Sequence, residues 1–346
     1  MKIIRFITNN SPSLIENDIE VYKKEFYKFS FVSEISIIIK NPIKLQFKDI
    51  NFFIENIPQN CDLNYVYPAK YNFFMPNLEF FRSYDQIKFI HIIFCKTFES
   101  YKYFKNYAIE HNLKYKMYYT KFYSYIPSHI IPQQKNINLF ICLAGKSFFK
   151  NIEYLINCWI NNNGFLSIDP LIELHITCYD MCWSSCIPKI DVSNININNN
   201  IINYKNLFIY TKKLSSELYV KLLTTANVAI CISRKEGYGH YINESRFFNT
   251  WVITMDNPPM NELIIDNKNG LLLKNKQDYY PQKEGKTKWK LYNAIPNMEE
   301  LTEKIKWCIY NKKTININNP SNKMFNSDKT YFKKKMKHII KNIKIS

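Results

Sequence analysis

Two glutamates, Glu236 and Glu244, flank a turn that contains the glycines Gly237 and Gly239. The whole chain has only 6 glycines, so two of them in one turn indicate backbone positions that need a residue without a side chain. Carboxylates accept hydrogen bonds from the vicinal hydroxyls of hexoses and riboses, and the free N–H groups at the start of a helix bind phosphate oxygens. This segment therefore predicts a site for a ligand that carries both sugar and phosphate.

The turn follows the apolar run Val228–Ser233, which has the pattern of a buried strand. Ligands of open α/β sheets bind at the carboxyl ends of the strands. Similar runs alternate with amphipathic stretches along the chain, which predicts an α/β fold. The other expected strands are Ile3–Thr8, Ile35–Ile39, Asn72–Met75, Phe89–Phe94, Lys116–Tyr119, Leu139–Ala144, Leu171–Thr177, Leu207–Tyr210 and Val252–Met255. The expected helices are Leu14–Phe29, Phe98–His111, Ile152–Trp159, one from Ser215 or Ser216 to Thr225, one capped by Asn297 and ending near Tyr310, and Phe332–Ile345, whereas the Asn-rich stretch Ile190–Asn206 is expected to be a loop.

From about Leu214 to Leu273 the chain resembles the donor-binding half of retaining, GT-B-fold glycosyltransferases of the family 4 type. Their signature has the form E-G-[FY]-G-x4-E, followed by a helix, a strand, a Pro-containing turn with another Glu, and a D-x-x-x-G tail. In this chain the successive elements are Glu236-Gly-Tyr-Gly-x4-Glu244, Trp251-Val-Ile-Thr254, Asn257-Pro-Pro-Met-Asn-Glu262 and Asp266-Asn-Lys-Asn-Gly270-Leu-Leu-Leu.

The resemblance implies roles for individual residues. Glu236 would orient the donor hexose as a catalytic residue, and Glu244 would hold the ribose of the nucleotide. The remaining residues of the implied donor site in this segment are Ser233, Gly237, Tyr238, Gly239 and His240. His240 has two open interpretations, a contact to donor or acceptor and a structural imidazole.

A second segment, Ala144-Gly145-Lys146-Ser-Phe-Phe-Lys150, looks like the family's G-R-x4-K-G segment, whose two cations grip the donor diphosphate. Lys146 and Lys150 would then be catalytic, because neutralising the departing nucleoside diphosphate is the main electrostatic task of the reaction. The segment departs from the pattern, since Lys replaces Arg and the spacing is one residue shorter. The alternative is a pair of solvated lysines at the start of a helix.

The N-terminal half resembles the family less, because it lacks a Gly-rich loop after the first strand. Polar residues nevertheless follow two of its expected strands, where an acceptor cleft would lie in a GT-B enzyme. These acceptor-side candidates are Asn77, Glu79, Lys96 and Thr97. Ordinary turn chemistry is the alternative for all four.

We expect no metal and no cofactor beyond the nucleotide-sugar co-substrate, for which UDP is favoured. His175, Cys178, Cys182 and Cys186 are residue types that zinc prefers, but their spacing lacks a second ligand pair, so buried small side chains are the favoured interpretation. The chain has no Asp-x-Asp, the metal-holding motif common in the other major glycosyltransferase fold. It also lacks the glycine motifs of P-loop and dinucleotide-binding proteins.

The formal net charge of +18 favours anionic partners, although an A/T-rich genome also enriches Lys. Nucleic acid is an alternative partner, because Lys and Tyr interleave over 102–125, but no nucleic-acid-binding signature is present. The basic helix near the C-terminus either packs on the protein or lies on an anionic membrane. No run of about 18 apolar residues and no signal peptide is found, and the 9 cysteines fit a reducing compartment, so we expect a cytoplasmic protein with peripheral membrane contact left open.

Together these patterns predict a GT-B protein with two Rossmann-like α/β domains facing across a cleft. We expect an acceptor-side domain over 1–130, a donor-binding domain over 131–315, and a basic helix over 316–346 that packs back on the first domain. The predicted reaction is metal-independent transfer of a hexose from a nucleoside-diphosphate sugar to a glycan, lipid or protein hydroxyl with retention. A catalytically inactive nucleotide-sugar-binding protein is the first alternative, and a nucleic-acid-binding protein the second.

Overall fold

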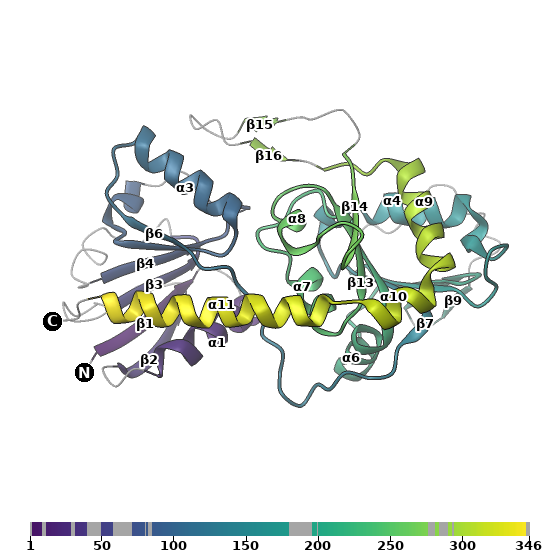
Figure 1. Ribbon diagram of the computed structural model, residues 1–346, viewed down its shortest axis with the longest axis horizontal. Coiled ribbons are helices and arrows are strands. Elements are labelled where there is room, and N and C mark those ends of the chain that lie inside the picture. The colour runs from purple at the N-terminus through teal and green to yellow at the C-terminus, as the bar shows by residue number, and fades with distance from the viewer. Residues whose placement is uncertain are drawn as a thin grey trace. The chain divides into compact units, whose positions relative to one another are not determined.

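The chain divides into two compact α/β units (Figure 1). Unit 1 comprises Met1–Tyr125, Lys283–Lys288 and Asn326–Ser346, and unit 2 comprises Ile126–Gln282 and Trp289–Phe325. The computed structural model describes residues 2–8, 12–28, 32–39, 50–57, 71–79, 81, 85–179, 196–198, 200–275, 281–283, 290–292 and 294–343.

Unit 1 is built on a parallel sheet. Its elements are β1 (Lys2–Thr8), α1 (Pro12–Phe26), β2 (Val32–Ile39), β3 (Ile50–Glu55), β4 (Tyr71–Pro76), the 3₁₀ turn η1 (Asp85–Phe89), β5 (Ile92–Cys95), α3 (Phe98–Glu110) and β6 (Lys116–Tyr119). The strand order is β2-β1-β3-β4-β5-β6. Every residue of β3 and β5 is buried, as is typical of inner strands covered on both faces.

Aromatic rings fill the core of unit 1. Phe52 on β3 contacts Phe6 at 5.2 Å, Phe94 at 5.3 Å and Phe73 at 5.9 Å between ring centroids. Figure 1 shows α3 beside β6, and α11 (Ser321–Asn342), in yellow, packs beside α1 through the rings of Phe332 and Tyr22.

The C-terminal helix α11 packs on unit 1, as predicted. The Phe332 ring lies 5.5 Å from the rings of Tyr22 and Phe122, and the apolar residues that follow it on the same face are buried. The lysines of the opposite face are exposed, among them Lys333, Lys334, Lys337 and Lys341. No helix in the described part of the chain is both long and apolar enough to cross a membrane.

Unit 2 is built on a mixed sheet with the order β14-β13-β12-β7-β8-β11-β10-β9. Its elements are β7 (Asn136–Leu143), η2 (Phe148–Lys150), α4 (Ile152–Asn161), η3 (Asn163–Phe165), β8 (Glu173–Thr177), β9 (Asn196–Asn198), β10 (Ile201–Tyr204), β11 (Leu207–Tyr210), α6 (Ser216–Thr225), β12 (Ala226–Cys231), α7 (His240–Phe247), β13 (Trp251–Met255), α8 (Met260–Leu263), β14 (Gly270–Leu273), β15 (Pro281–Lys283), β16 (Lys290–Tyr292), α9 (Met298–Tyr310) and α10 (Lys312–Asn318). The strands from β14 to β11 in this order are parallel, and β10 and β9 are antiparallel.

Helix caps confirm two of the predicted boundaries. Ser215 caps α6 by accepting the Leu218 N–H at 3.2 Å, and the Asn297 side chain accepts the N–H groups of Glu299 and Glu300 at the start of α9. These contacts are local, which is why the sequence predicts them well.

The predicted loop over Ile190–Asn206 is wrong in its second half, because β9 and β10 lie there. Ile202 is buried, and β10 pairs with β11 across a tight turn in which Lys205 has φ of +55°. The many asparagines of this segment favour a loop prediction, although apolar residues alternate along the hairpin. The strand β3 was likewise not among the predicted elements, since its short run follows a stretch rich in Lys.

Candidate functional site

The turn after β12 places the predicted donor-binding residues at the carboxyl end of a central strand. Gly239 precedes α7 with φ of +94°, a conformation that favours glycine. A Cβ atom at this position would also lie 3.3 Å from Ile242 Cδ1. Gly237 and Tyr238 are buried, and the Tyr238 hydroxyl accepts a hydrogen bond from Asn243 Nδ2 at 2.6 Å. The backbone of this turn is therefore fixed before any ligand arrives.

Glu236 is the centre of a polar cluster that joins three segments of unit 2. Ser233 Oγ donates to Glu236 Oε1 at 2.6 Å, and Lys150 Nζ forms an ion pair with the same oxygen. The Lys150 ammonium also lies 3.9 Å from the centroid of the Tyr241 ring, and the Tyr241 hydroxyl hydrogen-bonds Ser233 Oγ. Burial, and secondarily the nearby Glu236 carboxylate, raises the pKa of Tyr241 well above its usual value, so this residue stays a neutral phenol.

Glu244 lies on α7, and its carboxylate accepts a hydrogen bond from the Tyr219 hydroxyl of α6 at 3.3 Å. Burial raises the pKa of Glu244, while His240, Tyr219 and Lys150 oppose this shift. The Glu244 charge, together with burial, in turn raises the pKa of Tyr219 well above its usual value. Glu244 is thus a shielded carboxylate with a neutral phenol beside it.

The two predicted diphosphate-binding lysines differ in their surroundings. Gly145 has φ of +63° after β7, and its N–H donates to Thr177 Oγ1 at 3.0 Å, which fixes the end of β7 against β8. Lys146 is exposed in this loop. The Lys150 side chain is only 14% exposed and pairs with Glu236. The structure therefore brings Lys150 and Ser233 each into direct contact with Glu236 and places Lys146 in the loop before η2.

Tyr219 and Tyr241 belong to this site but were not among the predicted residues. Tyr241 lies between Glu236 and Glu244 in the signature segment, and this closeness in sequence could have identified it as a site residue. Tyr219 lies on α6, 25 residues before Glu244, and no local pattern in the sequence connects the two.

The predicted acceptor-side residues lie at strand ends of unit 1, and their contacts also fit structural roles. Asn77 is buried, and its side chain donates to Glu55 Oε1 at 3.4 Å and accepts the Glu79 N–H at 3.3 Å. Thr97 is buried and caps α3 by accepting the Ser100 N–H at 3.1 Å. Their acceptor role stays a prediction.

Lys96, the fourth acceptor-side candidate, forms an ion pair with Asp18 of α1 at 2.9 Å. Both side chains are 2% exposed, and the Lys96 ammonium lies 5.4 Å from the centroid of the Phe122 ring. This pair connects the end of β5 to α1 inside the unit.

Two of the four candidate zinc ligands, His175 and Cys178, lie within the described residues. His175 Nδ1 is 2.9 Å from the Tyr210 hydroxyl, its ring stacks on Phe208, and Cys178 is buried. Cys182 and Cys186 lie outside the described residues. Within the described ranges, no group of three or more His, Cys, Asp or Glu side chains is arranged to hold a metal ion.

One family model matches part of unit 2. Residues 201–283, which include β12, the glycine turn and α7, match the model of the family "Glycosyl transferases group 1". No curated protein matches the chain.

Solved structures with a similar fold include several sugar-transferring enzymes. Sucrose-phosphate synthase from Thermosynechococcus elongatus matches with a TM-score of 0.65 and 8% identity, over 99% of each chain. The Anabaena protein HepE in complex with UDP matches with a TM-score of 0.63 and 12% identity, over 99% of this chain and 100% of that one. The pneumococcal O-GlcNAc transferase GtfA in complex with UDP and GlcNAc matches with a TM-score of 0.58 and 13% identity, over 86% of this chain and 57% of that one.

The present chain thus spans little more than half the length of the pneumococcal enzyme. The fold is that of the GT-B glycosyltransferases, with Rossmann-like α/β units, and the predicted fold class is confirmed.

Proposed function

We propose that this protein transfers a hexose from a nucleoside-diphosphate sugar, with UDP as the favoured nucleotide, to an acceptor hydroxyl with retention of configuration. The observation that carries the proposal is the cluster of Glu236, Ser233 and Lys150 beside the glycine turn after β12. Ser233 and Glu236 lie in the segment that matches a glycosyltransferase family, at the carboxyl end of β12, where ligands of such folds bind.

Glu236 is suited to bind a sugar because its two oxygens have different surroundings. Ser233 and Lys150 both contact Oε1. In the described part of the chain, no hydrogen bond engages Oε2, which can therefore accept one from a donor hexose hydroxyl. Because the other oxygen is already anchored, this contact would orient the sugar at little entropic cost.

Lys150 is suited to stabilise the leaving group. Its ammonium faces a carboxylate and an aromatic ring, which hold it in one place while leaving it in a partly solvated position. As the bond between the anomeric carbon and the diphosphate breaks, negative charge develops on the diphosphate, and Lys150 with Lys146 would neutralise it. The acceptor hydroxyl would attack the same face of the sugar and pass its proton to the departing β-phosphate.

Glu244 would hydrogen-bond the ribose hydroxyls, with Tyr219 fixing its carboxylate. The UDP present in the structures of HepE and of the pneumococcal transferase supports the choice of nucleotide. Independence from metal is part of the proposal because lysines supply the positive charge that a divalent ion would otherwise provide.

The test is a thermal-shift panel of UDP-, GDP- and ADP-sugars and the bare nucleotides, with EDTA in every well. We expect one nucleotide to stabilise the protein, and its best sugar conjugate to be hydrolysed slowly with release of the nucleotide. Stabilisation without any release, even after a range of glycan, lipid and protein acceptors is added, would favour the binding-only alternative. A folded sample that responds to none of the nucleotides would contradict the proposed donor site.

A further inference from the structure

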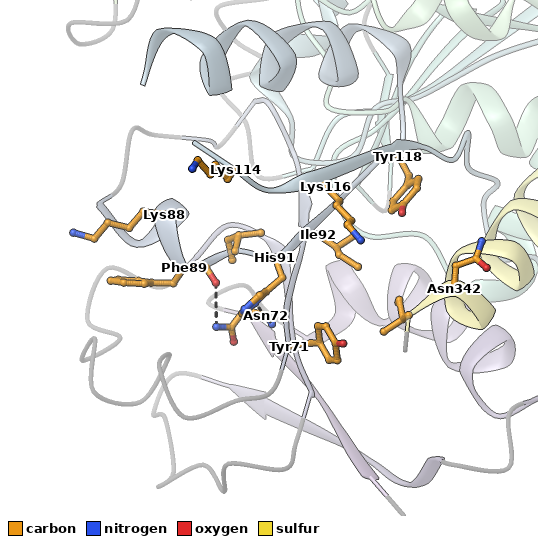
Figure 2. A pocket seen from close by; sticks show the side chains of 12 residues that line it. Tyr71, Asn72, Lys88, Phe89, His91, Ile92, Lys114, Lys116, Tyr118 and Asn342 are labelled. Atoms are coloured by element: carbon orange, nitrogen blue, oxygen red, sulfur yellow. Dashed lines mark hydrogen bonds between the residues drawn. The ribbon is translucent and has the colours of Figure 1, made fainter. Parts of the chain in front are cut away.

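Unit 1 contains a cavity of about 720 Å³ at the amino ends of the adjacent strands β4, β5 and β6 (Figure 2). Tyr71 and Asn72 open β4, Ile92 opens β5 and Lys116 opens β6. Asn342, the last residue of α11, and Ile343, which follows it, complete the lining. The candidate acceptor residues follow the carboxyl ends of β4 and β5, so this cavity lies at the opposite edge of the sheet and is a separate feature.

The lining carries positive charge and no carboxylate. Its cations are Lys88, Lys114 and Lys116, and no Asp or Glu is among the lining residues. All three lysines are exposed, and in the described part of the chain none of them forms an ion pair with a carboxylate. Figure 2 shows Lys116 beside Ile92 and nearer Tyr118 and Asn342, whereas Lys88 and Lys114 lie toward the other end and the Lys88 side chain extends outward.

The floor of the cavity is held by a hydrogen-bond network. The Asn72 backbone N–H donates to His91 Nδ1 at 3.0 Å, and Asn72 Nδ2 donates to the Phe89 carbonyl at 3.2 Å (Figure 2). The buried Asn51 amide donates to Asn72 Oδ1 at 2.9 Å. Because Nδ1 of His91 accepts a hydrogen bond, a neutral His91 carries its proton on Nε2 and offers an N–H donor.

Aromatic rings supply apolar walls. The rings of Tyr71 and His91 meet edge to face at 5.8 Å, and Phe89 and Tyr118 also line the cavity. A volume of this size falls in the range of about 300–1,000 Å³ that is typical of small-molecule sites, and it is much larger than one inorganic ion needs. A ligand that fills this cavity would therefore need an uncharged body that packs against the rings as well as an anionic group.

We propose that this cavity binds a phosphomonoester carried on a sugar or polyol, as a ligand site separate from the donor site. Phosphate fits better than carboxylate, because a lining with three lysines and no carboxylate favours a doubly charged anion, whereas planar carboxylates are best paired by Arg. The carboxyl end of α11 at the rim contributes a partial negative charge of about half a unit, which three ammonium groups outweigh. The phosphomonoester belongs either to a soluble sugar phosphate or to the headgroup of a phospholipid.

The test measures binding of glucose 6-phosphate to the full chain by calorimetry, with glucose and inorganic phosphate as reference ligands. A second arm measures co-sedimentation with phosphatidylcholine vesicles that contain or lack phosphatidic acid. The double variant Lys114→Gln/Lys116→Gln removes two cavity charges from exposed positions. The matched control Lys268→Gln/Lys313→Gln removes the same charge from exposed positions of unit 2. Lys150→Gln separates this cavity from the candidate donor site.

We expect the phosphomonoester to bind the wild type, the control variant and Lys150→Gln alike. The Lys114→Gln/Lys116→Gln variant should bind at least about tenfold more weakly while melting at the wild-type temperature. Binding of the sugar phosphate identifies a soluble ligand, and binding of phosphatidic acid vesicles alone identifies a headgroup. Absence of binding in both arms, or a loss in Lys150→Gln that the double variant does not show, would overturn the proposal.

Discussion

Each unit contains a lysine–carboxylate pair that joins the segment after a strand to another element, and the two pairs have different surroundings. In unit 1, Lys96 and Asp18 are each 2% exposed, and the Lys96 ammonium lies 5.4 Å from the centroid of the Phe122 ring. In unit 2, Lys150 and Glu236 are 14% and 10% exposed, and their shared oxygen is also bonded by Ser233. The first pair is enclosed, whereas the second remains within reach of a ligand.

The comparison teaches that a lysine after a β-strand is weak evidence for a ligand site. Lys96 and Lys150 each follow a strand that pairs in parallel with its neighbours, and both are candidates from the sequence. The two lysines differ in how deeply their ion pairs are buried. The charge of a fully buried lysine is neutralised within the fold, whereas a lysine in an accessible pair can leave its carboxylate and bind a phosphate.

Substitution of Lys96 should mainly affect folding. We expect Lys96→Met to lower the free energy of unfolding by about 3–5 kcal/mol, because it leaves Asp18 buried without its cationic partner. Urea denaturation followed by circular dichroism measures this change. The double variant Lys96→Met/Asp18→Leu should recover most of the lost stability, and a similar loss in both variants would contradict the role of the pair.

Substitution of Glu236 should mainly affect turnover. We expect Glu236→Ala to slow release of UDP from the best UDP-sugar about a hundredfold, because the sugar loses its orienting carboxylate, with a much smaller loss of affinity for bare UDP. Steady-state kinetics and calorimetry measure the two quantities. Glu303→Ala, an exposed position on α9, is the matched control and should change neither. Equal losses in turnover and UDP affinity would indicate a general structural role for Glu236.

Substitution of Glu244 should mainly affect nucleotide affinity. We expect Glu244→Ala to weaken UDP binding by about 1–3 kcal/mol, because the ribose loses hydrogen bonds in a shielded place. Burial raises the pKa of Glu244, so UDP affinity of the wild type should fall, as pH is lowered, earlier than for an ordinary glutamate. Calorimetric titrations across pH measure both effects. An unchanged affinity in the variant would remove the ribose role.

A third lysine extends the comparison, because its partners are neutral. Lys135 Nζ donates to the Ala226 carbonyl and to Thr250 Oγ1, each at 2.7 Å, and burial lowers the pKa of Lys135 to about 7. The unfolded chain therefore binds more protons than the folded one between that value and the ordinary value near 10.5, so stability rises with pH in this window.

We expect the free energy of unfolding of the wild type to gain about 1 kcal/mol relative to Lys135→Met between about pH 7 and pH 8. Urea denaturation of both proteins at a series of pH values measures this difference. Parallel pH dependences of the two proteins would show that Lys135 keeps an ordinary pKa.

The sequence predicted features that depend on neighbouring residues. The caps at Ser215 and Asn297 depend on backbone groups two or three residues away, and the turn from Glu236 to Gly239 depends on glycine conformations. The alternation of apolar runs therefore predicted the fold class, and the signature around Glu236 predicted a candidate site whose role stays a prediction.

Features that depend on distant residues were not predicted. The contact of Lys150 with Glu236 spans 86 residues, that of Tyr219 with Glu244 spans 25, and the ion pair of Lys96 with Asp18 spans 78. These side chains meet only after the strands have taken their order in the sheet. That order cannot be deduced from the pattern of residues in a single sequence. The cavity at the amino ends of β4–β6 has the same origin, since no motif joins Lys88, His91 and Lys116.

The central claim is that Lys150 belongs to a donor site and does not merely stabilise the fold. The most direct measurement is calorimetric titration of UDP in EDTA into the wild type, Lys150→Ala and the matched control Lys268→Ala. We predict metal-free binding to the wild type and the control, and at least about tenfold weaker binding to Lys150→Ala with little change in melting temperature. Equal UDP affinity in all three folded proteins would contradict the account.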